Sequence, residues 1–177
     1  MSAQEKCIIS VACRCPARTH WNTYMLKIGD HAPDFELPDQ DGRLLRLSTL
    51  LKRGPLLLYF YPADFTPVCT REACAFRDLQ PTLAAAGTAV VGISPQDSAS
   101  HARFREKHGL NFALLADPGK VVIRAYGCDG PLGFSVKRVS YLIGQDGRVM
   151  DIAHAALRVG PHTALAQQAA LAGKNHH

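Results

Sequence analysis

Short apolar runs alternate along the chain with stretches that have a helical period. Two of these runs, "PLLLYFYP" (55–62) and "TAVVGIS" (88–94), have the length and composition of buried strands. A third run, "NFALLAD" (111–117), predicts a short strand. Residues 66–86 and 97–109 have the helical pattern, and Gly109 is a stop signal for the second helix. We expect Pro81 to bend the first helix or to close it early.

The remaining segments complete an alternation of strands and helices. Residues 118–127 predict a helical turn and a half, and residues 137–154 predict a hairpin that turns on "GQDG". Residues 160–173 predict a closing helix, and residues 25–51 read as short strands separated by turns. This order predicts an α/β fold in which helices flank both faces of a central sheet.

The pattern changes character at Met25. Residues 1–24 have no steady period, and we expect them to form a flexible N-terminal extension. The domain is expected over residues 25–173, with residues 174–177 as a short C-terminal tail.

Composition narrows the class of protein. The 177 residues are 47% hydrophobic and 20% charged, as in a globular domain. The net charge of +5 comes without a basic run interleaved with aromatic residues, which argues against nucleic-acid binding. No apolar stretch approaches the roughly 20 residues that span a bilayer, so we expect a cytoplasmic protein. Six cysteines are too few for a disulfide scaffold of this length, and in a reducing compartment they indicate catalysis, metal binding or no role.

Cys69 lies where the first predicted strand ends and a helix begins, the place where α/β folds collect their chemistry. Thr66 suits the N-cap and Pro67 the first helical position, so Cys69 is expected in the first turn. Unpaired N–H groups and the helix dipole at that end favour thiolate over thiol. Either Cys69 is a reactive thiol, or it packs as a small apolar side chain under the helix.

Cys74 follows five residues later on the same predicted helix. Five residues of α-helix rise about 7.5 Å and turn roughly 500°. A disulfide needs Cα atoms within about 7 Å of each other and Cβ vectors that face one another. The two cysteines therefore cannot bond while the helix is intact, and pairing would require its first turn to unwind. Cys74 is either a buried helix residue or a resolving thiol for an oxidised Cys69.

The segment "YFYPADFTPVCTREACAFRD" (59–78) resembles the peroxiredoxins, and within them the Q-type branch of the bacterioferritin comigratory proteins. The family signature is a proline, then a threonine or serine, then a cysteine. Here Pro62, Thr66 and Cys69 meet it, and Cys74 matches the resolving cysteine of many members of that branch.

Other segments extend the resemblance to residues 26–149. "GDHAPDFELPDQDG" (29–42) is similar to the opening strands of the family, and residues 109–127 are similar to a later segment. "VKRVSYLIGQDGRV" (136–149) is similar to the strand that carries the active-site arginine, which falls on Arg138.

The resemblance implies a thioredoxin-like fold and the reduction of hydrogen peroxide or organic hydroperoxides, without cofactor or metal. Cys69 would attack the peroxide and become a sulfenic acid, and Cys74 would form a disulfide with it. Thioredoxin or a similar dithiol would reduce that disulfide. Thr66 and Arg138 would stabilise charge on the leaving oxygen, and Pro62 would shield the thiolate. Members of the branch are often monomers and some are dimers, so we expect a monomer or a weak dimer.

Phe65 and Cys128 depart from the pattern of the branch, and the role of Glu72 stays open. Phe65 replaces a common polar residue, which makes the rim of the pocket more apolar. Cys128 is not part of the pattern and is either a second thiol partner or an idle loop cysteine. Glu72 is either a residue that orients an arginine or a solvated helix residue.

Other chemistry is weakly supported by the remaining cysteines and histidines. Cys7, Cys13 and Cys15 lack the paired spacing of zinc sites. The eight histidines are scattered, and we expect them at the surface. A thiol–disulfide electron carrier would need a C-x-x-C pair. A copper-delivery protein could use His154, but its cysteines would lie closer together than the two in segment 66–74.

Overall fold

The computed structural model describes residues 9–10 and 24–172. The cysteines at positions 7, 13 and 15, nearly all of the predicted extension over residues 1–24, and the predicted tail lie outside the described residues.

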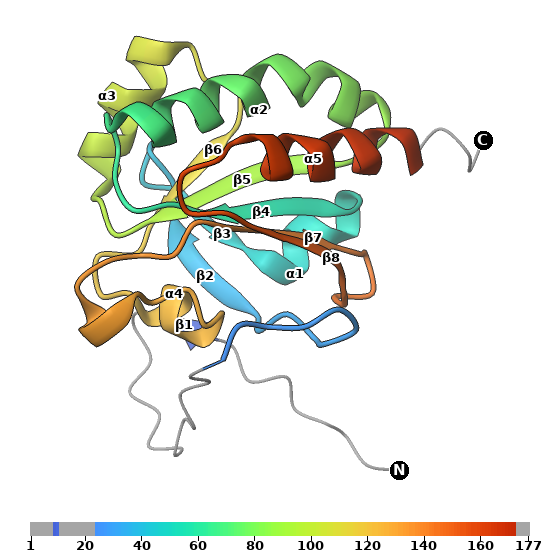
Figure 1. Cartoon of the computed structure of the whole chain (residues 1–177), viewed down its shortest axis with the longest axis horizontal. Coiled ribbons are helices and arrows are strands. Elements are labelled where there is room, and N and C mark those ends of the chain that lie inside the picture. Colours follow the sequence, from blue (N-terminus) through green and yellow to red (C-terminus); the bar gives the residue numbers. More distant parts are fainter. Residues whose placement is uncertain (1–8, 11–23, 173–177) are drawn as a thin grey trace.

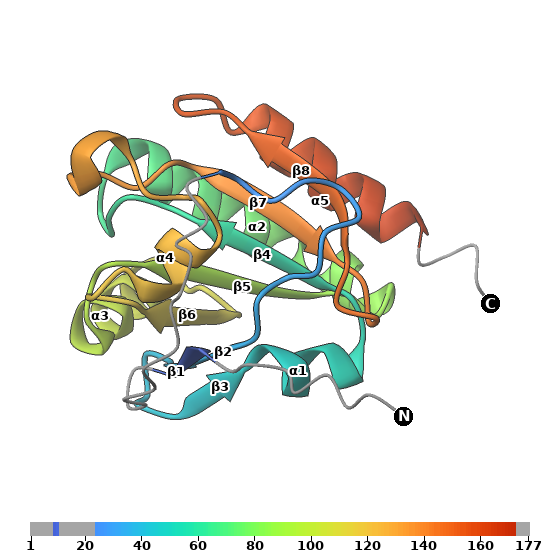
Figure 2. The ribbon, with the colours of Figure 1, turned by 90° about the horizontal axis from the view of Figure 1, so that it is seen from below.

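The main sheet has five strands in the order β6-β5-β4-β7-β8, which lie side by side in Figure 2. The strands are β4 (Leu56–Phe60), β5 (Ala89–Ser94), β6 (Ala113–Ala116), β7 (Val139–Ile143) and β8 (Val149–His154). β4, β5 and β6 are parallel to one another, while β7 is antiparallel to both β4 and β8. The predicted strands and the predicted hairpin are confirmed, and the sheet is mixed.

A smaller sheet has the order β1-β2-β3. Its strands are β1 (Ile9–Ser10), β2 (Phe35–Pro38) and β3 (Leu44–Arg46). The helices that follow in chain order are α1 (Leu47–Leu50), η1 (Leu51–Arg53), α2 (Pro67–Ala85), α3 (Ser98–His108), α4 (Val121–Ala125), η2 (Pro131–Gly133) and α5 (Gly160–Ala172).

Apolar clusters cover both faces of the main sheet. Successive side chains of β4 point to opposite faces, so this strand contributes to both clusters. Leu56, Leu58 and Phe60 join an apolar cluster with α4, α1 and the smaller sheet. Leu57 and Tyr59 join a second cluster with α2, α3 and α5. Figure 1 shows α2 and α5 side by side on one face and α4 with β2 on the other. The predicted arrangement of helices on both faces is confirmed.

Helix α2 continues past Pro81 to Ala85, so it does not close early at that proline. A proline has no N–H for the carbonyl four residues before it. At Pro81 that carbonyl belongs to Arg77, and the side chain of Asn111 donates to it at 3.3 Å. The hydrogen bond lost inside the helix is therefore replaced from outside.

One edge of the main sheet gathers the segments that carry the candidate chemistry. Val139 at the start of β7 pairs with Phe60 at the end of β4 and with His154 at the end of β8. Arg138 and the loops after β4 and β8 therefore meet at this edge. Helices α2 and α5 both begin there, at the left of Figure 1.

Candidate active site

Cys69 is the third residue of α2, as the sequence predicts, and only 1% of it is exposed. The helix begins at Pro67, with Thr66 as its N-cap residue in an extended conformation. The first N–H groups of a helix have no partner within it, so this end carries a partial positive charge beside the sulfur. The sulfur also accepts a hydrogen bond of 3.0 Å from Nη2 of Arg138.

Arg138 is buried immediately before β7 and is held by three contacts. Besides the bond from Nη2 to Cys69, its Nη1 pairs with Oε2 of Glu72, and its Nε donates to the carbonyl of Ala156 at 3.2 Å. Burial lowers the pKa of Arg138, but the charges of Glu72 and Cys69 raise it by more. The guanidinium is therefore a permanent cation held against the sulfur.

Glu72 lies three residues after Cys69, so that both side chains lie on one face of α2. It is fully buried and paired with Arg138, and the interpretation as a solvated helix residue is wrong. Burial raises the pKa of Glu72 to about 7, although Arg138 opposes the rise. The carboxyl group orients the guanidinium toward the sulfur.

The loop between β4 and α2 holds Pro62 and Thr66, both half-buried. The hydroxyl of Thr66 donates to the carbonyl of Ala63 at 3.2 Å and makes no side-chain cap. Phe65 has a φ of 62°, in the left-handed region that non-glycine residues rarely adopt. The residue is 43% exposed, and its ring meets the ring of Phe104 edge-on, with centroids 5.2 Å apart. Phe65 is therefore a partly exposed apolar residue in the loop that precedes Cys69.

A buried polar cluster anchors this loop to α3. The carboxylate of Asp64 accepts hydrogen bonds from Tyr61 at 2.8 Å and from Ser100 at 2.7 Å, and it lies 2.9 Å from Nδ1 of His101. Nε2 of His101 faces the carbonyl of Leu115 at 3.2 Å. Both ring nitrogens of His101 therefore face oxygen atoms, which hold the ring between the loop and β6. Burial raises the pKa of Asp64, but the bonds from His101, Ser100 and Tyr61 lower it by more.

Cys74 and Cys128 lie outside the contact between Arg138 and the sulfur of Cys69. Cys74 is half-buried on α2, which is continuous between it and Cys69, and all three cysteines are free thiols. Cys128 is buried on the opposite face of the sheet, in the cluster with α4. The structure therefore brings together Cys69 and Arg138, with Thr66 and Pro62 in the adjoining loop.

Two histidines correct the expectation that the histidines lie at the surface. His101 and His162 are both fully buried. Neither is signalled by the sequence: His101 lies in a polar helix, and His162 follows a Gly-Pro pair at the start of α5. Asp64 was also missed, because an acidic residue between a strand and an N-cap reads as a solvated loop residue.

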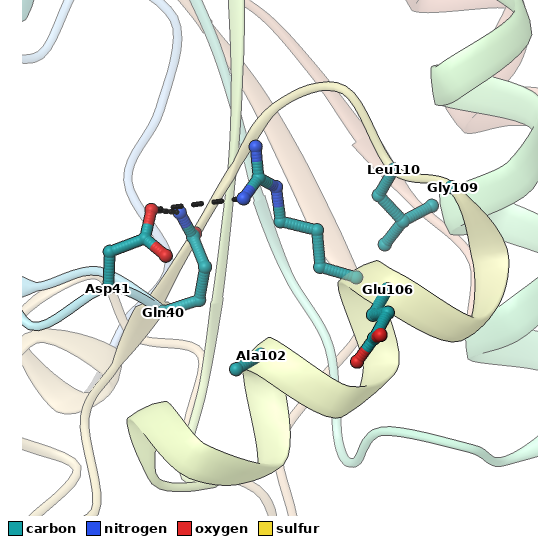
Figure 3. A pocket seen from close by; sticks show the side chains of 7 residues that line it. Gln40, Asp41, Ala102, Glu106, Gly109 and Leu110 are labelled. Atoms are coloured by element: carbon teal, nitrogen blue, oxygen red, sulfur yellow. Dashed lines mark hydrogen bonds and ion pairs between the residues drawn. The ribbon is translucent and has the colours of Figure 1, made fainter.

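A separate pocket of about 400 Å³ lies between the turn after β2 and helix α3. Figure 3 shows Gln40 and Asp41 on one side of it and Ala102, Glu106 and Leu110 on the other. None of the predicted site residues lines this pocket.

Two further features are absent from the part of the chain that the structure describes. In residues 9–10 and 24–172, His, Cys, Asp and Glu side chains do not gather in threes as metal ligands. Among the helices of that part, none combines the length and the apolar character needed to cross a bilayer.

The chain is similar to known proteins both in sequence and in structure. The AhpC/TSA family model matches residues 28–152. Chloroplastic peroxiredoxin Q of Oryza sativa is 46% identical over 125 residues, covering 70% of this chain and 57% of that protein. The crystal structure of peroxidoxin BcpB from Mycobacterium tuberculosis has a TM-score of 0.78 at 40% identity and covers 84% of this chain and 98% of that chain. Peroxiredoxin Q of Xanthomonas campestris has a TM-score of 0.70 at 28% identity, covering 80% and 90%.

The chain thus spans little more than half the length of its rice relative, 57%, and nearly all of the mycobacterial one, 98%. The matched segment contains Pro62, Thr66, Cys69, Cys74 and Arg138. The structural neighbours confirm the thioredoxin-like fold. The chain belongs to the AhpC/TSA family and, within it, to the peroxiredoxins related to peroxiredoxin Q and BcpB.

Proposed function

We propose that this chain is a thiol-dependent peroxidase that reduces hydrogen peroxide and organic hydroperoxides through Cys69. The observation that carries the proposal is the 3.0 Å contact from Nη2 of Arg138 to the sulfur of Cys69 in the first turn of α2. A helix N-terminus and a guanidinium both stabilise thiolate, the nucleophilic form of cysteine. Membership of the family supports the same assignment.

In the first step the thiolate attacks one peroxide oxygen. The S–O bond forms, the O–O bond breaks, and the leaving hydroxide or alkoxide takes a proton to become water or alcohol. Cys69 is oxidised to sulfenic acid and the peroxide is reduced. Arg138 and the N–H groups of the first turn stabilise the charge that develops on the leaving oxygen.

Thr66 and Pro62 shape the place where the peroxide binds. Because the hydroxyl of Thr66 donates to Ala63 at 3.2 Å, its oxygen keeps lone pairs that accept the O–H of a hydroperoxide. Pro62 fixes the backbone of the loop that follows β4 and limits the access of water to Cys69.

In the second step the thiol of Cys74 attacks the sulfenic sulfur, an S–S bond forms, and water leaves. The two cysteines lie five residues apart on one continuous helix, so this step requires the first turn of α2 to unwind. Thioredoxin or a similar dithiol then reduces the disulfide. We assign this cycle to a monomer or weak dimer in a reducing compartment such as the cytoplasm, where such reductants operate.

The test is stoichiometric. One equivalent of hydrogen peroxide added to the reduced protein should consume two thiols and give a Cys69–Cys74 crosslink in a peptide map. Cys69→Ser should abolish turnover, and Cys74→Ser should leave a sulfenic acid that dimedone traps. Cys128→Ser is the matched control and should turn over peroxide normally. Peroxide turnover by Cys69→Ser with thioredoxin as reductant would contradict the proposal.

A further inference from the structure

His162 is a buried histidine to which the proposed reaction gives no role. It is the third residue of α5 and lies beyond the segment that the family model matches, residues 28–152. Its Nδ1 lies 3.5 Å from Oε1 of Glu72. Because Glu72 also pairs with Arg138, the imidazole is connected to the sulfur of Cys69 through two side chains.

The surroundings of His162 fit the ring with one proton or with two. Nε2 faces the carbonyl of Ala155 at 3.2 Å and therefore carries a hydrogen. Nδ1 lies 2.8 Å from the hydroxyl oxygen of Ser140. A hydroxyl can turn to donate to a neutral ring or to accept from an imidazolium. Nδ1 can therefore gain or lose a second proton while it keeps its hydrogen bond with Ser140.

The carboxyl oxygen that faces this nitrogen lacks a partner. Oε1 of Glu72 is buried and has no hydrogen bond from any of the residues that the structure describes. A carboxylate oxygen and the lone pair of a neutral imidazole repel each other, and burial makes that repulsion costly. One proton on either atom would turn the contact between Glu72 and His162 into a hydrogen bond.

The charge balance of Cys69, Glu72 and Arg138 also calls for one bound proton. Two acids, Cys69 and Glu72, flank a single cation, Arg138. If both acids are ionised, the buried cluster carries a net negative charge, which is expensive to desolvate. We propose that His162, with Glu72, holds one proton whenever the sulfur of Cys69 is ionised. Arg138 then faces one buried anion instead of two, and His162 is a positioning residue for the thiolate.

The proton balance of this step is simple. The thiol proton of Cys69 moves to the contact between Oε1 of Glu72 and Nδ1 of His162, and nothing is oxidised or reduced. Burial raises the pKa of Glu72 to about 7, although Arg138 opposes it, and burial lowers the pKa of His162 to about 4. The raised pKa of Glu72 and the lowered pKa of His162 both favour the carboxyl group as the site of the shared proton. Nδ1 of His162 then accepts a hydrogen bond from it.

Further titratable groups act on this pair from the elements packed around it. From β4, Tyr59 presents a buried hydroxyl, and burial raises its pKa well above the ordinary value, so that it stays protonated. Asp64 acts on Tyr59 from the loop before α2 and lies 2.9 Å from Nδ1 of His101. From β8, His154 acts on His162 and is exposed to solvent.

The test measures the ionisation of Cys69 directly, through its alkylation by iodoacetamide in a Cys74→Ser background, because only the thiolate reacts. His162→Phe removes the acceptor of the shared proton. We expect its alkylation rate to fall about tenfold at pH values below the midpoint of the wild-type rate–pH profile, where one pKa unit changes the thiolate fraction tenfold.

A second background separates proton holding from packing. In Glu72→Gln the amide group carries permanent N–H bonds, so no shared proton is needed. Adding His162→Phe to Glu72→Gln should therefore slow alkylation by less than about threefold, and the two substitutions are non-additive. Should the Phe variant fail to fold, His162→Asn keeps a polar group near Nδ1 without basicity and should show the same tenfold loss, about one pKa unit.

The control is His31→Phe, which replaces an exposed histidine outside the cluster and should leave the rate unchanged. A wild-type rate in His162→Phe or His162→Asn would overturn the inference, and so would an equal slowing with and without Glu72→Gln. The inference rests on Cys69 being the reactive thiol of the proposed function. The two fail separately, because normal alkylation of Cys69 without peroxide turnover would overturn the proposed function alone.

Discussion

Cys69 and Cys128 are equally buried, at 1% and 0% exposed, yet they lie on opposite faces of the main sheet in opposite surroundings. The sulfur of Cys69 accepts a hydrogen bond from the guanidinium of Arg138. The sulfur of Cys128 donates toward the carbonyl of Tyr126 at 3.6 Å and the hydroxyl of Tyr141 at 3.8 Å. Burial alone therefore does not decide the reactivity of a thiol; the charge beside it does.

Two neighbouring cations precede β7, and their side chains point to opposite faces of the main sheet. Arg138 turns toward Cys69, whereas Lys137 donates to the carbonyl of Gly127 at 3.1 Å, on the side of Cys128. Successive residues of an extended chain point to opposite sides. Burial raises the pKa of Cys128 to about 12, and its hydrogen bond with Tyr141 and the charge of Lys137 offset only part of that rise. A cation stabilises a buried thiolate only when it is aimed at the sulfur.

The largest expected difference between the two faces is in chemical labelling. With a pKa of about 12, Cys128 should react with iodoacetamide about three orders of magnitude more slowly than a free thiol of pKa near 8.5. Cys69 should be labelled quickly in the same native sample. Peptide mapping over time at pH 7 measures both rates, and urea should expose Cys128. Comparable native rates would break the comparison.

Arg138→Met tests the cation next. It removes a donor aimed at the sulfur, and we expect the rate of peroxide reduction to fall about 10²–10³-fold, as when an oxyanion donor is lost. It also leaves Glu72 buried without its cation, which should lower the free energy of unfolding by about 3–5 kcal/mol. Stopped-flow kinetics and urea denaturation measure the two effects.

The control for this change is Lys137→Met, which removes the neighbouring cation from the other face. We expect it to leave the peroxide rate unchanged, because Lys137 contacts Gly127 and not Cys69. Equal losses in the two variants would mean that net charge, and not the direction of the side chain, governs the thiol.

Asp64→Asn probes the polar character of the Cys69 face without touching the sulfur. It removes the buried carboxylate that pairs with His101, and we expect a loss of about 2–3 kcal/mol in the free energy of unfolding at pH 7. Because the pKa of Asp64 is lowered from 3.8 in the folded protein, its stabilising effect is complete above that pH. The effect is lost as the pH falls through the folded-state value.

Urea denaturation of wild type and variant between pH 7 and pH 3 measures this difference. The gap between the two curves should narrow toward acid. A gap that stays constant with pH would mean that the carboxylate of Asp64 is not the group responsible.

The sequence predicted the fold well because buried strands are continuous apolar runs, which a single sequence displays. It also predicted the first turn of α2, since Thr66 and Pro67 act locally. It could not predict the buried partners of Glu72, because a glutamate on a helix reads the same whether it faces water or Arg138. His162 lies 90 residues from Glu72 in the chain, and the two meet because α5 packs against α2, β7 and β8.

Cys128→Ala should give the smallest effect and the sharpest contrast with the Cys69 face. It removes one sulfur from a cluster of apolar and aromatic side chains, and we expect a loss of about 1 kcal/mol in the free energy of unfolding. The peroxide rate should stay at the wild-type value, because the thiol of Cys128 lies across the sheet from Arg138. Denaturation and steady-state kinetics measure both quantities. A slower recycling of the oxidised enzyme would show instead that Cys128 exchanges with the disulfide, which would return it to the role of a second thiol partner.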